Sequence, residues 1–193
     1  MAARTKPGSA RQQILQAAGE LFFKDGYRAI GVDTVVEQSG VAKMTLYRHF
    51  ASKDDLLVAY LQEANDQFWA WFEAAAAPYA GDGRGQLTAV FAALEQWLAN
   101  PQCHGCPFIN AGAEFSDAEH PVHRAALAHK QAVRERLRGM AEAAGARAPD
   151  VLADQLLLLM DGGYVQARLY GSEPSPARHI AAAAAALIAA QVE

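Results

Sequence analysis

The sequence predicts an all-α protein of about nine helices, with a short three-helix head followed by a longer helical body. Three observations carry this prediction. Of the 193 residues, 52% are apolar, and the chain is rich in alanine and poor in β-branched runs. Apolar residues recur at helical spacing along most of the chain. The prolines beyond residue 77 fall between these stretches or in their first turns, where a helix tolerates them.

The first helix is expected to run from its N-cap, Ser9, to about Lys24. Ile14, Ala18 and the apolar residues that follow them at helical spacing form one stripe. Gly26 comes next, at the position where a helix end favours a left-handed backbone. The sequence therefore opens with an N-capped helix whose apolar residues lie on one face.

Residues 31–50 are typical of two short helices joined by a tight turn at Gly40. Val35 gives the first helix an apolar edge, and Leu46 and Phe50 anchor the second. The second helix exposes side chains suited to phosphates and base edges: Lys43, Thr45, Tyr47, Arg48 and His49. This arrangement predicts a helix-turn-helix whose second helix enters a DNA major groove.

A longer, more specific motif surrounds this unit. It comprises Gly26-Tyr27, Gly40-Val41, Lys43, Thr45-Leu46-Tyr47, His49-Phe50, Ser52-Lys53 and Leu56-Leu57. The motif resembles the N-terminal domain of the TetR family of bacterial transcriptional regulators, over about a quarter of the chain. Gly31 departs from the family, which usually has Ser or Thr there as an N-cap; glycine is a weaker cap.

The expected DNA contacts divide into two groups. Contacts to phosphates, which position the protein, are assigned to Lys43, Thr45, Tyr47 and Lys53. Contacts to base edges or a thymine methyl group are assigned to Met44, Arg48 and His49. The resemblance implies contacts at Thr45, Tyr47, His49 and Lys53, whereas family members vary at the positions of Lys43, Met44 and Arg48. The alternative is a charged helix that is merely solvated.

The charge distribution fits a protein that meets DNA at one end. The chain has a net charge of −4, yet the residues up to Lys53 carry +4 and the rest −8. Arg4, Lys6 and Arg11 open the chain as a basic arm, expected to be disordered before residue 7. A basic head on an acidic body is expected when only the head binds phosphates.

The body is expected to begin with a long helix that Ser52 caps and that extends to Pro78. Five further helices are expected at about residues 84–100, 107–115, 121–143, 149–169 and 175–192. We therefore divide the chain into a DNA-binding domain, residues 1–52, and an effector-binding and dimerisation domain, residues 53–193. The long helix would act as the lever between them.

An apolar pocket for a small organic effector is expected in the body. Its predicted lining is Phe68, Trp71 and Phe72 on the long helix, facing Phe91, Phe108, Asn110, Glu114, Met160 and Tyr164. The polar Asn110 and Glu114 stand among apolar neighbours, and the family resemblance implies an inducer site. The alternative for each aromatic side chain is ordinary core packing.

The last two helices are unusually rich in small residues, which allow close helix packing. A two-fold dimer interface is expected at Asp161, Gly162, Gly163, Ala181, Ala184, Ala185 and Ile188. In the TetR family the last two helices form such a dimer. The alternative is a close crossing inside one chain.

Cys103 and Cys106 form a CxxC with His104 between them, and His120 and His123 follow. A thiol redox pair and a metal site are alternatives to a structural role, but no second CxxC is present. We therefore predict no metal and no cofactor.

The sequence carries no recognisable catalytic motif, so an enzyme is not expected. No stretch is long and apolar enough for a membrane span, and a cytoplasmic location is expected. The predicted function is a homodimeric TetR-type repressor that binds a palindromic double-stranded DNA operator and is released by an effector. The alternative is a ligand- or thiol-redox-responsive protein without specific operator binding.

Overall fold

The computed structural model describes residues 9–171 and 173–192, and its regular structure over these ranges is entirely helical. The head contains α1 (Ala10–Asp25), α2 (Val32–Ser39) and α3 (Lys43–His49). The body contains α4 (Lys53–Ala76), α5 (Gly83–Leu98), α6 (Pro107–Glu114), α7 (Pro121–Ala143), α8 (Pro149–Tyr170) and α9 (Ile180–Gln191). Two 3₁₀ turns, η1 (Ala77–Tyr79) and η2 (Pro176–His179), precede α5 and α9. The all-α prediction is confirmed; Arg4 and Lys6 of the predicted basic arm lie outside the described residues.

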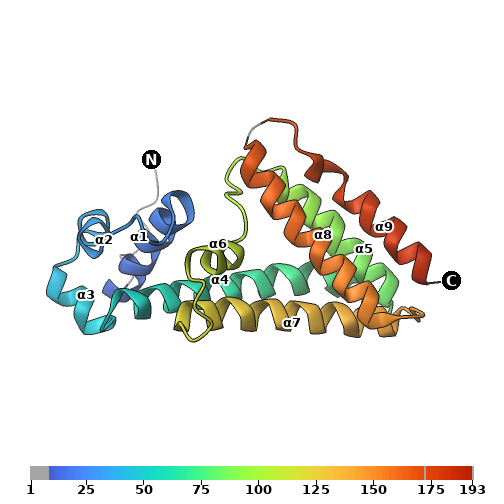
Figure 1. The fold of residues 1–193 in the computed structure, drawn as a ribbon, viewed down its shortest axis with the longest axis horizontal. Helices are drawn as coiled ribbons and strands as arrows, with labels where there is room; N and C mark the ends of the chain where they lie inside the picture. The colour runs from blue at the N-terminus through green and yellow to red at the C-terminus, as the bar shows by residue number, and fades with distance from the viewer. Residues whose placement is uncertain (1–8, 172, 193) are drawn as a thin grey trace.

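The molecule is elongated, with the head at one end and the α5, α8 and α9 group at the other (Figure 1). Helix α4 leaves the head and runs beside α7 into the body, where it also packs on α5. The short α6 packs on α7 and α4, between the head and the α5 and α8 pair. Helix α4 therefore connects the head directly to the centre of the body.

Two serines fix the helix starts that orient the head. The Ser9 hydroxyl accepts a hydrogen bond from the Gln12 backbone N–H (3.3 Å), and that of Ser52 accepts one from the Asp55 N–H (3.0 Å). Gly31 begins α2 without any side-chain cap, as the sequence predicts. Helix α2 therefore relies on packing through the buried Val35 rather than on its cap.

Most helix ends lie within two residues of the predicted ones, and the main difference is at the C-terminus. There the expected single helix over residues 175–192 is divided into η2 and α9. Pro176 stands in the first turn of η2, and the Ser175 hydroxyl accepts from the Ala177 N–H. The α-helix begins only at Ile180, where the alanine-rich run starts.

One continuous apolar core joins head and body. It extends from Ile14 and Phe22 of α1, through Leu57 and Leu61 of α4, to Ile188 of α9. No gap in the core separates the head from α4, which packs directly on α1. None of the helices among the described residues is long and apolar enough to cross a bilayer.

Candidate DNA-binding face and effector pocket

Helix α3 presents a face of exposed side chains while Leu46, on its other side, is completely buried. Met44 is 74% exposed and Tyr47 is 42% exposed, although both are large and largely apolar. Such exposure on a seven-residue helix serves no packing purpose inside this chain. The face suits contact with phosphates and thymine methyl groups, because a methionine and a phenol lie beside several cations.

The charged residues of this face have only weak internal partners. Lys43 forms an ion pair with Asp33 of α2 (Nζ to Oδ1, 2.6 Å), and both side chains are more than half exposed. Hydrogen bonding to Asp33 raises the pKa of Lys43. Arg48 donates to the Thr45 hydroxyl (3.2 Å). Exposed interactions of this kind contribute little stability. Lys43 and Arg48 can therefore each exchange the present partner for a DNA phosphate.

The remaining predicted DNA contacts flank this face. His49 is exposed at the last position of α3, and Lys53 is half-buried at the first position of α4. Partial burial lowers the pKa of Lys53. The structure brings all seven predicted contact residues to the α2–α3 end of the head and the adjoining start of α4.

A pocket of about 610 Å³ lies between the head and the body. Helix α1 forms one wall through residues 12–23, and helix α4 forms another through residues 60–71. Residues 105–108 before and within α6, together with Trp97 of α5 and Tyr164 of α8, close the remaining side. The predicted site was placed wholly in the body, whereas this pocket also touches α1 of the head.

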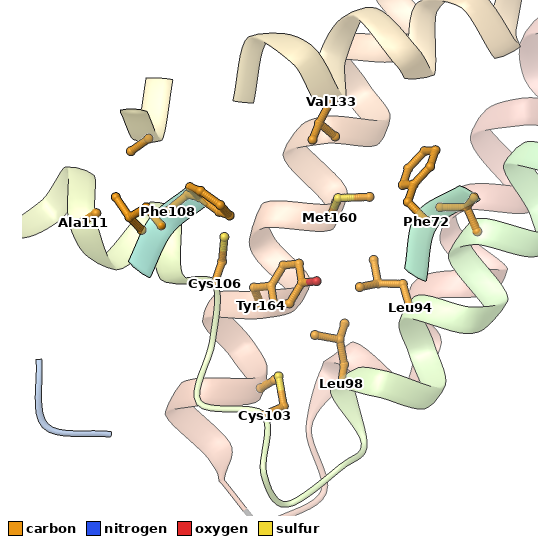
Figure 2. Packing of buried hydrophobic residues seen from close by; sticks show 14 of the residues in the cluster. Phe72, Leu94, Leu98, Cys103, Cys106, Phe108, Ala111, Val133, Met160 and Tyr164 are labelled. Carbon is orange, nitrogen blue, oxygen red and sulfur yellow. The ribbon is translucent and has the colours of Figure 1, made fainter. Parts of the chain in front are cut away.

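The predicted pocket residues separate into three sets. Four of them line this pocket: Phe68, Trp71, Phe108 and Tyr164. Phe72, Phe91 and Met160 are fully buried in the core instead; Figure 2 shows Phe72 and Met160 there. Asn110 is half-buried outside the lining, and Glu114 contacts the head.

The prediction omitted several lining residues. On α4 these are Tyr60, Glu63, Ala64 and Gln67, which share a helical face with Phe68 and Trp71. Their spacing could have revealed them. The α1 residues Gln12, Gln16, Glu20 and Phe23 could not be found in this way, because their role depends on where α1 packs.

The Glu114 carboxylate fastens the end of α6 to the loop after α1. One oxygen accepts from the Tyr27 N–H (3.0 Å) and the other from the Arg28 N–H (2.7 Å). The buried Tyr27 hydroxyl donates to the Pro107 carbonyl at the start of the same helix (2.7 Å). Both ends of α6 therefore hold the head, and the start of α6 also lines the pocket.

Gly26 is required at this junction for two reasons. Its φ of +90° is unfavourable for residues with a side chain, and a Cβ there would approach a Glu114 carboxylate oxygen to 2.9 Å. A second contact closes the junction nearby, where the rings of Phe23 and His104 meet edge to face with centroids 5.4 Å apart.

The CxxC residues lie in the core. Cys103 and Cys106 are both free thiols, each 5% exposed, and Figure 2 shows them in the cluster with Tyr164 and Leu98. Burial raises the pKa of both thiols, which suppresses the reactive thiolate. These features favour the structural alternative.

The three histidines considered with them have separate partners. The ring of His104 meets Phe23, His120 pairs with Asp54 (3.3 Å), and His123 Nδ1 lies 2.7 Å from the Phe115 carbonyl. No group of three metal-ligating side chains forms within residues 9–171 and 173–192.

Several residues of the predicted dimer interface face the inside of their own chain. Gly163 is buried, and a Cβ there would approach Ile180 to 2.5 Å and Leu98 to 2.8 Å. Ala184 and Ile188 are about 1% exposed. Asp161 pairs with Lys130 of α7, and the half-buried Ala181 donates its N–H to Glu95. Gly163 thus serves the close crossing inside one chain, while Gly162 and Ala185 remain exposed.

A different face of α8 is unpaired within the chain. Val151, Leu158, Gly162, Val165 and Leu169 recur at helical spacing and are all exposed, Leu158 and Leu169 by more than 70%. Exposed alanines of α9 lie on the adjacent helix. An apolar stripe of this length on a polar surface is typical of a helix-to-helix interface.

Comparison with known proteins agrees with this architecture. Residues 14–60 match the family model "Bacterial regulatory proteins, tetR family", and residues 83–183 match "Tetracyclin repressor-like, C-terminal domain". A TetR-family transcriptional regulator from Streptomyces coelicolor, SCO4454, is 30% identical with a TM-score of 0.84, covering 94% of this chain and 93% of that one.

The curated relatives match a short part of this chain. The transcriptional activator FasR of Mycolicibacterium smegmatis is 46% identical over 56 residues, which are 29% of this chain and 26% of FasR. The fatty acid metabolism regulator protein of Bacillus subtilis is 38% identical over 56 residues, 29% of each chain. This chain thus matches less than a third of the length of either relative.

Proposed function

The chain belongs to the TetR family of bacterial transcriptional regulators, and we propose that it is a cytoplasmic repressor whose dimer binds a palindromic operator. The observation that carries this proposal is the exposed face of α3, with Met44 and Tyr47 uncovered beside several cations. In this proposal residues 1–52 read DNA, and residues 53–193 bind the effector and the second subunit. Lys43, Thr45, Tyr47 and Lys53 contact phosphates, while Met44, Arg48 and His49 select the bases.

The proposed dimer forms through the exposed stripe of α8 and the alanine face of α9. A two-fold axis would place one α3 from each subunit in successive major grooves, so the operator would be a palindrome. Isologous packing of these two helices would bury apolar side chains from both subunits, since Val151, Leu158, Val165 and Leu169 are apolar and exposed in the single chain.

Effector release is proposed to act at the junction of head and body. A ligand in the pocket would touch α1 and α4 together, and also the start of α6, whose other end binds the Tyr27–Arg28 backbone. It releases DNA only to the extent that it binds the released state more tightly than the DNA-bound state.

The proposal is tested by fluorescence anisotropy with the promoter region upstream of the protein's own gene. Tyr47→Ala and Lys53→Ala should weaken binding and flatten its salt dependence, by a slope of about one for the lost lysine. Met44→Ala should alter base preference and leave the salt dependence unchanged. Arg84→Ala, which removes an exposed cation of α5, is the matched control for Lys53.

Wild-type affinity in both Tyr47 and Lys53 variants would contradict the assignment of α3. If the wild-type chain did not distinguish promoter DNA from random DNA, the alternative of a ligand- or thiol-responsive protein would replace it. Because FasR is named an activator, repression is tested separately, by transcription from the same promoter with and without the protein.

A further inference from the structure

We propose that the pocket between α1 and α4 takes a hydrophobic aromatic cation. This inference rests on the proposed function only in treating the pocket as the effector site. The cavity of about 610 Å³ has the size typical of sites for drug-sized molecules.

The charge of the lining has one sign. Among the residues that line the pocket, the side chains charged at neutral pH are Glu20 of α1 and Glu63 of α4, and no lysine, arginine or histidine lines it. Glu63 is half-buried and has no basic partner among the described residues. Glu20 accepts a hydrogen bond from Gln16 (3.3 Å), a neutral partner. A cation entering the pocket would therefore meet the half-buried Glu63 carboxylate and, at the exposed side, the Glu20 carboxylate, whereas an anion would be repelled by both, more strongly by Glu63 because it is less exposed to solvent.

Seven of the other sixteen residues that line the pocket are aromatic. Tyr60, Phe68 and Trp71 stand on α4 beside Glu63, and Trp97 faces them from α5. The Phe68 and Trp71 rings are 5.7 Å apart at their centroids, and neither side chain is fully buried. Aromatic faces attract cations, tryptophan most strongly, and they also stack on aromatic ligands.

The negative charge and the aromatic side chains of the lining together determine the class of ligand. An apolar neutral molecule would gain the aromatic contacts but leave the Glu63 carboxylate in contact with an apolar surface. A small hydrated cation would gain the carboxylates but fill little of the cavity. An aromatic cation with a diffuse charge satisfies both groups, because its charge is weakly hydrated and its rings cover the walls.

A pair of probes of matched shape tests the charge preference. Tetraphenylphosphonium and tetraphenylborate have nearly the same size and opposite charge. Binding of each to the full-length protein, without DNA, is measured by calorimetry and by quenching of tryptophan fluorescence, since Trp71 and Trp97 line the pocket. The cation should bind at least about tenfold more tightly than the anion.

Two variants localise the effect. Glu63→Gln and Glu20→Gln should each weaken binding of tetraphenylphosphonium several-fold. Each should also reduce the ratio of the affinity for tetraphenylphosphonium to that for tetraphenylborate. Glu173→Gln removes the same charge from an exposed loop outside the pocket and should leave both affinities unchanged. Circular dichroism of each variant establishes that the helices are intact.

Equal or tighter binding of tetraphenylborate would overturn the proposal, as would unchanged affinity for the cation in the Glu20→Gln, Glu63→Gln double variant. Release of promoter DNA is measured in a separate titration. If the cation binds with the expected charge dependence but promoter affinity does not change, the ligand class stands and the release step of the proposed function fails.

Discussion

His129 is a buried histidine that its surroundings keep neutral. It is 5% exposed, its ring stacks on Phe108 at 3.5 Å, and its Nδ1 lies 2.9 Å from the Asn65 side-chain oxygen. The Trp69 indole donates to the same oxygen (3.1 Å), so Nδ1 must carry a proton and donate as well. Burial, with a smaller contribution from Lys130, lowers the pKa of His129 to about 3.

This pKa predicts how stability changes with pH. Between pH 6.5 and 3 the unfolded chain binds a proton at His129 that the folded chain does not, so stability is lost as pH falls through this window. The contribution is about 1.4 kcal/mol per pH unit. Urea unfolding at pH 7 and pH 5 should show a smaller drop in the free energy of unfolding for His129→Gln than for wild type. His179→Gln, at an exposed site, is the control; equal drops in wild type and His129→Gln would contradict the assignment.

At the scale of elements, α6 is a second part of the body, besides α4, that touches both the pocket and the head. Pro107 and Phe108 line the pocket at its start, and Glu114 holds the Tyr27–Arg28 backbone at its end. An eight-residue helix moves as a unit, so displacement at one end reaches the other. The lever predicted from sequence was α4 alone, and the structure adds this shorter connection.

Loss of the Glu114 carboxylate should loosen the head. In Glu114→Gln the amide group retains one acceptor for two backbone N–H donors, so one donor loses its partner at a cost of about 1–3 kcal/mol. Hydrogen exchange at Tyr27 and Arg28 should accelerate, and the melting temperature should fall. Glu119→Gln removes an exposed carboxylate five residues away and should change stability by less than about 0.5 kcal/mol. Unaltered exchange at both amides of Glu114→Gln would show that the clamp does not hold the head.

The elements could be predicted from sequence because their signals are local. The stripe of α7 and the proline at its first position place that helix at residues 121–143, the range observed. The exposed side chains of α3 follow in the same way from Leu46 and Phe50 as anchors. Such patterns give the faces of a helix without saying which neighbour each face meets.

The lining of the pocket depends on which helices pack against each other, so the sequence predicted only part of it. Gln16 and Glu20 line it because α1 lies against α4, where the Tyr60 ring would come within 3.2 Å of a Cβ at position 19. Glu114 was expected in the pocket because a carboxylate among apolar residues suggests a ligand. Its actual partners are backbone groups that lie 86 and 87 residues away in sequence, which no composition or spacing reveals.

At the scale of the whole molecule, the proposed dimer depends on the exposed stripe of α8. Small residues suggested Gly163 and Ala184 for this interface, but both pack inside the chain, and the larger exposed Leu158 and Leu169 are better candidates. Their exposure in a single chain is the reason for the reassignment.

Leu158→Glu should separate the dimer without unfolding the subunit, because the side chain is 72% exposed in the single chain. Sedimentation should show a monomer with wild-type helical content, and affinity for a palindromic operator should fall steeply because the two heads no longer act together. Leu127→Glu, at an exposed leucine of α7, is the matched control. A Leu158→Glu protein that remains dimeric would place the interface elsewhere.

Filling the pocket between α1 and α4 should change the affinity of the protein for DNA. It can be measured without knowing the ligand, by placing a large side chain in the cavity. Ala64 lines the pocket from α4 and is half-buried, so Ala64→Trp would occupy the space that an effector takes.

The decisive measurement is the operator affinity of Ala64→Trp by fluorescence anisotropy, with melting temperature and dimer content measured on the same preparation. We expect a protein that is folded and dimeric but binds the operator about 5- to 150-fold more weakly, the usual range of coupling between two sites. The loss of operator affinity caused by Ala64→Trp should be smaller in a protein that also carries Glu114→Gln. Wild-type operator affinity in a folded, dimeric Ala64→Trp protein would contradict the claim that this pocket controls the DNA-binding head.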